Sequence, residues 1–209
     1  LSPVNVADYP YREISGVSFR NVCLSVWRNE KKMAEASGDL LFTHDNLSGP
    51  LMLNLSKEIR QGDTIKLNYL YPEDKNTVIE KISAALKNSR GSLPKLLSKE
   101  LLLPKSFLQL VADRSGNRTK EIAANLTGDT FLVASVAGYN KAMVTSGGIS
   151  LTEINSKRME LKRYPGLYAI GEVLDIDGFT GGYNLQFAYS SARAASSSIT
   201  EGLGTRRED

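Results

Sequence analysis

The amino-acid sequence predicts a mixed fold of the α+β class, with strands first, helices next and a strand–loop–helix unit last. Apolar and polar residues alternate through much of residues 1–72, as they do in half-buried strands. Between residues 73 and 128 the apolar residues recur at helical spacing instead. Near the C-terminus a short apolar run, a glycine-rich loop and a second helical pattern follow one another. This succession of segments is typical of a mixed fold.

Breaks in the alternating pattern indicate where the predicted strands begin, bend and turn. Residues 1–12 are expected to form an extended lead-in, and the alternation starts after them. It slips by one position at Arg20–Asn21, which predicts a bend or a bulge. Residues 30–32 are expected at a hairpin tip, and residues 37–43 and 64–70 are expected to be further strands.

The helical pattern begins with Ser48-Gly49-Pro50, because proline is well tolerated in the first turn of a helix and serine or glycine precedes it well. The block from residue 73 to residue 128 is amphipathic, rich in leucine and joined by short loops. A helical-bundle subdomain explains this block without any ligand. Its four helices are expected to begin near Glu73, Ser92, Pro104 and Thr119.

Composition and charge restrict the possible partners. The net charge of +3 is small, and Lys31–Lys32 and Arg206–Arg207 are pairs rather than a basic stripe, so no nucleic-acid partner is expected. Cys23 is the only cysteine, which excludes an intramolecular disulfide and a cysteine zinc site and fits a cytoplasmic location. No apolar run is long enough to span a bilayer, so no membrane partner is expected, and no metal site is predicted.

His44 is the only histidine and precedes Asp45. A histidine beside an aspartate is a candidate general base, because its ordinary pKa lies near neutrality. The alternative is that His44 fixes a turn through local hydrogen bonds, and this second interpretation is favoured.

The stretch from Gly166 to Ala195 organises the rest of the chain. Residues 167–170 form a short apolar run between two glycines, which favours a buried strand. Glu172 follows this run, at the carboxyl end where open α/β sheets bind their ligands. A loop with Gly178, Gly181 and Gly182 then leads into a helix expected from Tyr183. One face of this helix is expected to carry Leu185, Ala188, Tyr189, Ala192 and Ala195.

The first turn of that helix directs N–H groups toward its end, where an electronegative partner such as a phosphate, a carboxylate or a carbonyl edge is favoured. An ordinary crossover whose glycines only allow tight turns remains the alternative. The turn at Ser146-Gly147-Gly148 is likewise open to two interpretations: it brings backbone N–H groups close to a cofactor, or it is an ordinary turn.

Three stretches together resemble one known family. They are Gly166-Leu-Tyr-Ala-Ile-Gly-Glu with Asp175-Ile-Asp-Gly and Thr180-Gly-Gly-Tyr-Asn-Leu-Gln, then Ala142-Met-Val-Thr-Ser-Gly-Gly-Ile-Ser-Leu-Thr-Glu-Ile-Asn, and Leu41-Phe-Thr-His-Asp-Asn-Leu-Ser-Gly-Pro. They resemble the signatures of the YhiN/BaiN-like flavoproteins, which are FAD-dependent bacterial oxidoreductases. The resemblance runs from about residue 1 to residue 199.

The resemblance implies a FAD-dependent oxidoreductase that transfers hydride through bound flavin, with a small-molecule substrate and NAD(P)H or oxygen as the second redox partner. Family members begin with a Gly-x-Gly-x-x-Gly turn that holds the FAD pyrophosphate, and this sequence has no such pattern. The chain is therefore expected to be a fragment that lacks the N-terminal half of its FAD domain and holds no FAD by itself. The alternative is a non-catalytic insert, lid or partner-docking domain.

The resemblance also implies a division of the chain and a set of site residues. Residues 1–72 with 129–137 are expected to form a β-barrel-like insert domain, 73–128 a helical subdomain, 138–200 the last part of a split Rossmann-like FAD domain, and 201–209 a disordered tail. No catalytic residue is identified. The expected cofactor-binding residues are Gly147, Gly148, Gly171, Glu172, Gly181, Gly182, Tyr183, Asn184, Leu185 and Gln186.

Among these residues, the resemblance implies that Glu172 hydrogen-bonds the ribityl chain of the flavin. The backbone of residues 184–186 is implied to face the pyrimidine edge of the ring, and Gly181 and Gly182 to let the loop approach it.

Overall fold

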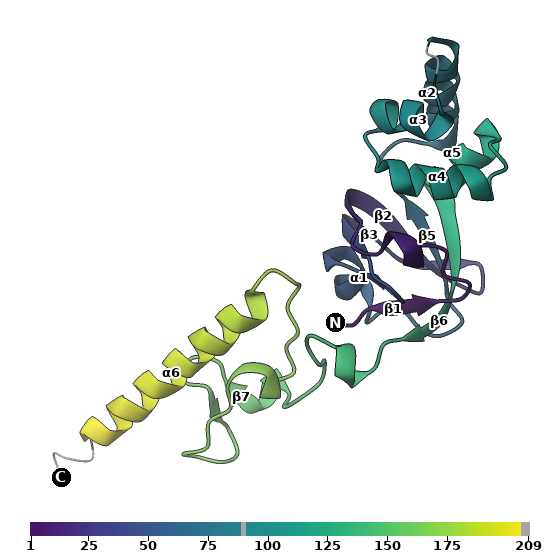
Figure 1. Ribbon diagram of the computed structural model, residues 1–209. Coiled ribbons are helices and arrows are strands. Elements are labelled where there is room, and N and C mark those ends of the chain that lie inside the picture. Colours follow the sequence, from purple (N-terminus) through teal and green to yellow (C-terminus); the bar gives the residue numbers. More distant parts are fainter. Residues whose placement is uncertain (89–90, 206–209) are drawn as a thin grey trace. The chain divides into compact units, whose positions relative to one another are not determined.

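The computed structural model describes residues 1–88 and 91–205 (Figure 1). These residues divide into two compact units. The barrel unit comprises Ser2–Lys141, and the terminal unit comprises Leu1 together with the residues from Ala142 onward. In the described residues, no helix is both long enough and apolar enough to cross a membrane.

The barrel unit is built on a closed, six-stranded antiparallel barrel with the order β1-β4-β3-β2-β5-β6, as counted over the described residues. The pairing of β1 with β6 closes the sheet. Together with the helices described below, this barrel confirms the predicted mixed α and β class. The strands are β1 (Val4–Val6), β2 (Ser18–Arg28), β3 (Lys31–Phe42), β4 (Leu47–Ser48), β5 (Thr64–Asn68) and β6 (Asp129–Val136).

The long hairpin of β2 and β3 tests the local expectations. Its register shifts between Phe19 and Val22, so the predicted irregularity at Arg20–Asn21 is confirmed. The turn lies at Asn29 and Glu30, both with positive φ, which is the backbone that a two-residue hairpin turn requires. The strand expected at residues 37–43 is only the second half of β3.

Helix α1 (Pro50–Leu55) begins where the Ser48-Gly49-Pro50 pattern predicts a helix. Gly49 has a φ of 93°, and a Cβ atom there would lie 2.8 Å from the backbone nitrogen of Leu41. A side chain is thus excluded both by the backbone conformation and by the close approach of β3.

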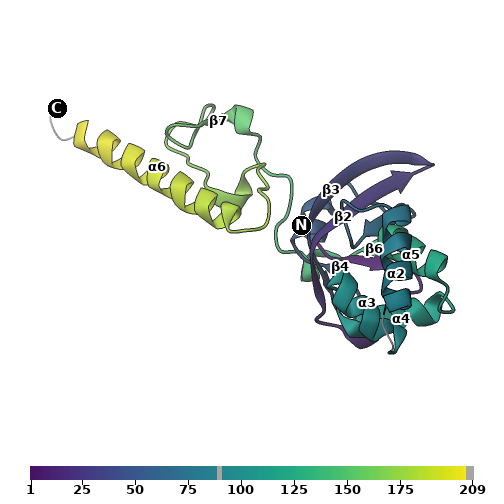
Figure 2. The same ribbon diagram turned by 90° about the horizontal axis from the view of Figure 1, so that it is seen from above.

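Four further helices follow in the barrel unit, each beginning within two residues of its expected start. They are α2 (Lys75–Asn88), α3 (Leu93–Leu101), α4 (Lys105–Arg114) and α5 (Thr119–Gly128). They gather at one end of the barrel (Figure 1), and the view from above shows the four helices grouped together (Figure 2). Their apolar sides and the barrel interior form one continuous hydrophobic core.

An aromatic cluster joins these helices to the barrel. The ring of Phe107 on α4 is fully buried, and its centroid lies 4.8 Å from that of Phe19 and 4.7 Å from that of Tyr69. Tyr11 stacks on Phe42 with ring centroids 4.3 Å apart. Since Tyr11 is fully buried, the segment expected as an extended lead-in supplies one of the central core residues.

A buried polar network lies beside this cluster. Asp129 at the start of β6 is only 1% exposed and accepts hydrogen bonds from the hydroxyls of Tyr11 and Tyr69 and from Nη2 of Arg114, the last at 3.2 Å. Burial raises the pKa of the Asp129 carboxyl, and the charge of Arg114 opposes that change. The network ties α4 to the barrel because an Asp129 carboxylate without these donors is costly to bury.

The terminal unit has little regular structure before its long helix. It contains β7 (Ile154–Asn155), β8 (Glu160–Leu161), the 3₁₀ turns η3 (Leu151–Glu153) and η4 (Gly171–Val173), and helix α6 (Tyr183–Thr205). Two further 3₁₀ turns, η1 (Arg12–Ile14) and η2 (Tyr139–Lys141), belong to the barrel unit.

The buried core of the terminal unit is small. In the part of the chain that the structure describes, it consists of five residues: Ile154, Met159, Ala169, Leu174 and Ala195. Among the described residues, one parallel bridge, between Ile149 and Leu174, connects two of its extended segments.

Two expectations for the terminal unit are wrong. Residues 167–170 do not form a buried strand, because Leu167 is 54% exposed, Ile170 is 43% exposed and only Tyr168 takes part in a bridge. Helix α6 begins at Tyr183 as expected, but Leu185 and Tyr189, expected on the packed face, are exposed. Ala195 of the expected face is buried, and Ser191 and Ser198 are buried beside it, so the inward face is turned away from Leu185 and Tyr189.

The end of the chain also differs from its expectation. Residues 201–205 belong to α6 rather than to a disordered tail, and residues 206–209 lie outside the described residues.

Candidate functional site

A cleft of about 350 Å³ opens at the N-terminal end of α6. Apolar side chains make most of its wall, and a carboxylate, two glycines and an amide add polar groups. Its lining residues from η4 and the following loop are Glu172, Ile176, Phe179, Thr180, Gly181 and Gly182; α6 adds Asn184, Leu185, Phe187 and Ala188, and Leu1, Met143 and Val144 complete it. A mostly apolar hollow with a few converging polar groups is the usual form of a small-molecule site.

Glu172 is held in position by the segment that precedes the Gly147–Gly148 turn. Its Oε1 atom accepts a hydrogen bond from the backbone N–H of Thr145 at 2.8 Å. The chain enters η4 at Gly171, whose N–H donates to the hydroxyl of Ser191 on α6 at 3.1 Å. Glu172 is thereby fixed on a turn that is attached to both neighbouring segments.

The loop before α6 closes on itself through Asn184. The Oδ1 atom of Asn184 accepts from the N–H of Gly178 at 2.8 Å, and its Nδ2 atom donates to the carbonyl of the same glycine at 2.9 Å. Gly181 and Gly182 have φ values of 119° and 91°, which side chains rarely tolerate. A Cβ atom on Gly182 would meet nothing within 4 Å, so this part of the loop is open to a ligand.

The N-terminal end of α6 contributes the electrostatics of the cleft. The hydrogen bond from the N–H of Gln186 to the carbonyl of Gly182 is the first of the helical i to i−4 type. The preceding N–H groups have no such partner within the helix, and the helix dipole gives this end a positive partial charge. The arrangement suits an electron-rich ligand edge.

Two predicted glycines have a packing function. A Cβ atom on Gly148 would lie 2.5 Å from the carbonyl oxygen of Val173, so glycine is required where this segment pairs with residues 173–175. Gly171 has a φ of 64° and lies against Ala188. Both residues determine the position of Glu172 rather than line the cleft.

The structure brings five of the ten predicted site residues together at the cleft: Glu172, Gly181, Gly182, Asn184 and Leu185. Gly147, Gly148, Gly171, Tyr183 and Gln186 lie nearby along the same segments without lining it. The cleft also contains residues that sequence reasoning missed, among them Met143 and Phe179. Phe179 is 61% exposed although it is aromatic, and its place inside a glycine loop was the signal that could have revealed it.

His44 lies in the turn between β3 and β4 in the barrel unit. That turn is fixed by Thr43, whose hydroxyl donates to the carbonyl of Asn46 at 2.9 Å and accepts from its N–H at 3.1 Å. His44 therefore lies in a turn as expected, but the hydrogen bonds that fix this turn are made by Thr43 and not by His44.

Comparison with known proteins identifies the family. Residues 19–198 match the family described as HI0933-like protein Rossmann domain. The chain belongs to the HI0933-like Rossmann domain family. This match extends over both compact units, and it supports the coarser form of the resemblance inferred from the sequence motifs.

Curated relatives of this HI0933-like chain have two different names. It is 35% identical over 168 residues to the ribosomal RNA dihydrouridine synthase of Escherichia coli and 36% identical over 175 residues to that of Haemophilus influenzae. Each alignment covers 77% of the chain and 42% of the synthase. The 3-dehydro-bile acid delta(4,6)-reductase of Clostridium scindens is 24% identical over 222 residues, which cover 96% of the chain and 53% of that protein.

The HI0933-like chain thus spans less than half of the length of the two synthases. The described residues hold an antiparallel barrel and helices, and their parallel pairing is the bridge between Ile149 and Leu174. Residues 138–200 were expected to contain a strand, a loop and a helix. In the structure the strand is absent from residues 167–170, and a loop, the 3₁₀ turn η4 and helix α6 surround the cleft.

Proposed function

We propose that this chain is part of a longer FAD-dependent oxidoreductase and that its terminal unit holds the isoalloxazine end of the cofactor. The observation that carries the proposal is the cleft at the N-terminal end of α6, in which Glu172, the Gly181–Gly182 loop and Asn184 converge. When bound, the flavin supplies the hydride chemistry, and the protein supplies position and charge.

The residues of the cleft fit an isoalloxazine ring. The apolar side chains Phe179, Phe187 and Leu185 suit a flat aromatic ring, and the open backbone at Gly182 leaves room for it. Glu172 would hydrogen-bond the ribityl chain while Thr145 keeps it in place. The backbone of residues 184–186 would face the pyrimidine edge, where the positive end of α6 stabilises negative charge.

The pyrophosphate of FAD is assigned to a part of the protein outside this sequence, since the chain has no Gly-x-Gly-x-x-Gly turn. Three exposed apolar residues of the terminal unit support this assignment: Leu167, Leu185 and Tyr189. Exposed apolar side chains of this size are residues that the remaining portion of a FAD domain would cover. By itself the chain is then expected to bind FAD weakly or not at all.

The proposed reaction is the saturation of a carbon–carbon double bond. The names of the relatives, dihydrouridine synthase and delta(4,6)-reductase, both describe the addition of hydrogen across such bonds. We propose NAD(P)H as the source of the hydride, with oxygen as a competing acceptor from reduced flavin.

Two substrate classes are candidates. The higher identity to the two synthases favours a uracil base in RNA, and the reductase leaves a small molecule as the second candidate. The RNA candidate is opposed to the prediction, made from the small net charge, that the chain has no nucleic-acid partner.

A second candidate function is a docking or lid domain that binds no flavin. It is favoured by the barrel unit, which has a complete core of its own and contains none of the ten predicted cofactor residues.

The test begins with visible absorption spectra of the purified full-length protein and of this chain. A flavin band is expected in the full-length protein and not in the chain. Glu172→Ala in the full-length protein should weaken FAD binding about tenfold, because a hydrogen bond to a charged group is lost. Glu153→Ala is the matched control, because Glu153 pairs with Arg163 and does not line the cleft. His44→Ala should also leave FAD binding unchanged.

A colourless full-length protein would overturn the oxidoreductase proposal and favour the docking domain. Equal loss of FAD in the Glu172 and His44 variants would show that the site has been misplaced.

A further inference from the structure

The positive charge of the chain is concentrated in one segment. Residues 73–128 contain ten lysine and arginine residues and six aspartate and glutamate residues. Residues 1–72 together with 129–137 contain eight basic and nine acidic residues, and residues 138–209 contain eight of each. The net charge of +3 for the whole chain therefore comes from the helical segment, because the other two parts are close to neutral.

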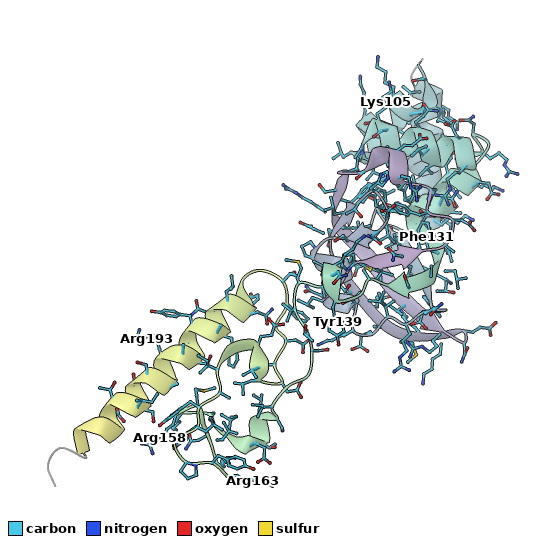
Figure 3. All side chains as sticks on the ribbon, turned by 60° about the horizontal axis from the view of Figure 1, so that its bottom comes forward. Lys105, Phe131, Tyr139, Arg158, Arg163 and Arg193 are labelled. Carbon is cyan, nitrogen blue, oxygen red and sulfur yellow. The ribbon has the colours of Figure 1, made fainter. Side chains whose placement is uncertain are left out.

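Three lysines of this segment are exposed on α3 and at the start of α4. Lys95 and Lys99 are one helical turn apart on α3, and Lys105 begins α4, where Figure 3 labels it on the helical end of the barrel unit. Within the described residues, none of the three is in an ion pair. Their charges are therefore available to an external anion.

Leu102 lies between Lys99 and Lys105 in the sequence and is the left-handed C-cap residue of α3, between the buried Leu101 and Leu103. It is 87% exposed and has a φ of 54°, a conformation that is unfavourable for a residue with a branched side chain. Residues 95, 99 and 102 are spaced as residues on one face of a helix are. An apolar side chain held outward at a strained position is a feature of contact surfaces.

Beside this loop is a cleft of about 580 Å³, formed between the barrel rim and the α3–α4 junction. The barrel side provides Arg20 and Tyr71, and the helical side provides Leu102. The remaining lining residues are Ser18, Phe19, Tyr69, Leu70, Leu101, Leu103 and Pro104. Arg20 is exposed on the β2 bulge and forms no ion pair with another described residue, and Tyr71 is 44% exposed.

Arg20 and the accessible ring of Tyr71 line the cleft, and the three lysines lie on α3 and α4, the two helices joined by its lining residues 101–104. Proteins bind single-stranded RNA by tracking its phosphates with lysine and arginine while unstacked bases lie against aromatic side chains. An acidic protein would use the lysines but has no need of an exposed tyrosine beside a cleft. The arrangement thus favours RNA over an acidic polypeptide.

We infer that this surface, formed by Arg20, Tyr71, Lys95, Lys99, Leu102 and Lys105 and here named the basic rim, binds single-stranded RNA. The lysines and Arg20 contact phosphates, and a base lies in the cleft against Tyr71 and Leu102. The inference rests on the RNA candidate of the proposed function, and it assigns RNA recognition to the barrel unit, separately from the flavin cleft.

The test measures binding of a fluorescein-labelled oligouridylate of about twelve nucleotides to this chain by fluorescence anisotropy at low salt. The triple variant Lys95→Glu/Lys99→Glu/Lys105→Glu should lose affinity about tenfold or more and show a smaller salt dependence. The matched control, Lys31→Glu/Lys141→Glu/Lys157→Glu, makes the same change in net charge at exposed lysines elsewhere and should change affinity less than about twofold.

A second pair of variants tests the stacking contact. Tyr71→Ala should weaken RNA binding about tenfold and leave binding of heparin, a polyanion without bases, unchanged. Tyr164→Ala, which removes another exposed tyrosine, should alter neither. Circular dichroism confirms that each variant is folded.

Equal losses in the two triple variants would overturn the inference, because binding would then follow net charge alone. Tight binding of polyglutamate without binding of RNA would overturn it in favour of a protein partner. The assay needs no flavin, so a yellow full-length protein without RNA binding rejects only the basic rim, and RNA binding by a colourless protein rejects only the oxidoreductase.

Discussion

The barrel unit and the terminal unit bury very different amounts of apolar surface. In the described residues, the core of the barrel unit contains 31 buried hydrophobic residues, and the core of the terminal unit contains five. The terminal unit nevertheless exposes several large apolar side chains, including Phe179, Tyr183 and Leu185. The difference shows that the barrel unit has the core of an independent domain, whereas the terminal unit leaves apolar surface for a ligand or a partner to cover.

The largest expected effect sharpens this comparison in the barrel unit. Phe107→Ala removes a fully buried ring from the aromatic cluster and should lower the free energy of unfolding by about 3–5 kcal/mol. Urea denaturation monitored by the fluorescence of Trp27, the single tryptophan, measures it.

The control for this variant lies in the terminal unit. Phe179→Ala removes a ring that is 61% exposed and should change the free energy of unfolding by no more than about 0.5 kcal/mol. Similar losses in both variants would mean that the two units do not differ in their packing.

The second prediction concerns an ion pair at the barrel. Arg28 donates to Asp63 from Nε at 2.7 Å and from Nη2 at 2.8 Å, and this hydrogen bonding lowers the pKa of Asp63. Asp63→Asn should cost about 1.5–3 kcal/mol at neutral pH, because hydrogen bonds to charged groups are among the stronger ones.

The pH dependence follows from the sign of this shift. The contribution of Asp63 is fully present above its unfolded pKa of about 3.9 and is lost as the pH falls through the lower folded pKa. The stability difference between the unmodified chain and Asp63→Asn should therefore shrink in acid. Asp8→Asn, at an exposed position, serves as the control, and a difference that grows in acid would contradict the assignment.

The smallest effect is expected in the terminal unit. Gly148→Ala places a methyl group 2.5 Å from the carbonyl oxygen of Val173 and should destabilise this unit by about 1–3 kcal/mol. Limited proteolysis should cleave residues 142–205 faster while the unfolding of the barrel unit stays unchanged. Gly147→Ala is the control, because the added methyl group meets no neighbour within 4 Å and only the positive φ is unfavourable. Equal proteolysis of both variants would show that the close contact between Gly148 and Val173 is not the cause.

The features of the site that could be predicted are those determined by neighbouring residues. The glycine loop and the start of α6 at Tyr183 follow from local residue types. Glu172 and Asn184 were implied by the family resemblance; both line the cleft, and their contact with a cofactor stays a prediction. The inward face of α6 could not be predicted, because the small residues on this helix allow several faces to pack. Met143 reaches the cleft through a turn whose direction no local pattern specifies.

By itself, the sequence determined the mixed fold class, the bulge at Arg20–Asn21 and the helix starts. These properties depend on backbone preferences and periodicities within a few residues. The family was indicated separately, by the resemblance of three motif stretches, and the match over residues 19–198 supports its coarser form. Only the tertiary structure decided that β1 closes the barrel on β6, that Tyr11 and Arg114 meet at Asp129, and that Arg20 and Tyr71 of the barrel rim line a cleft with Leu102. Such contacts join residues that are far apart in the chain, and the packing of the whole core selects them.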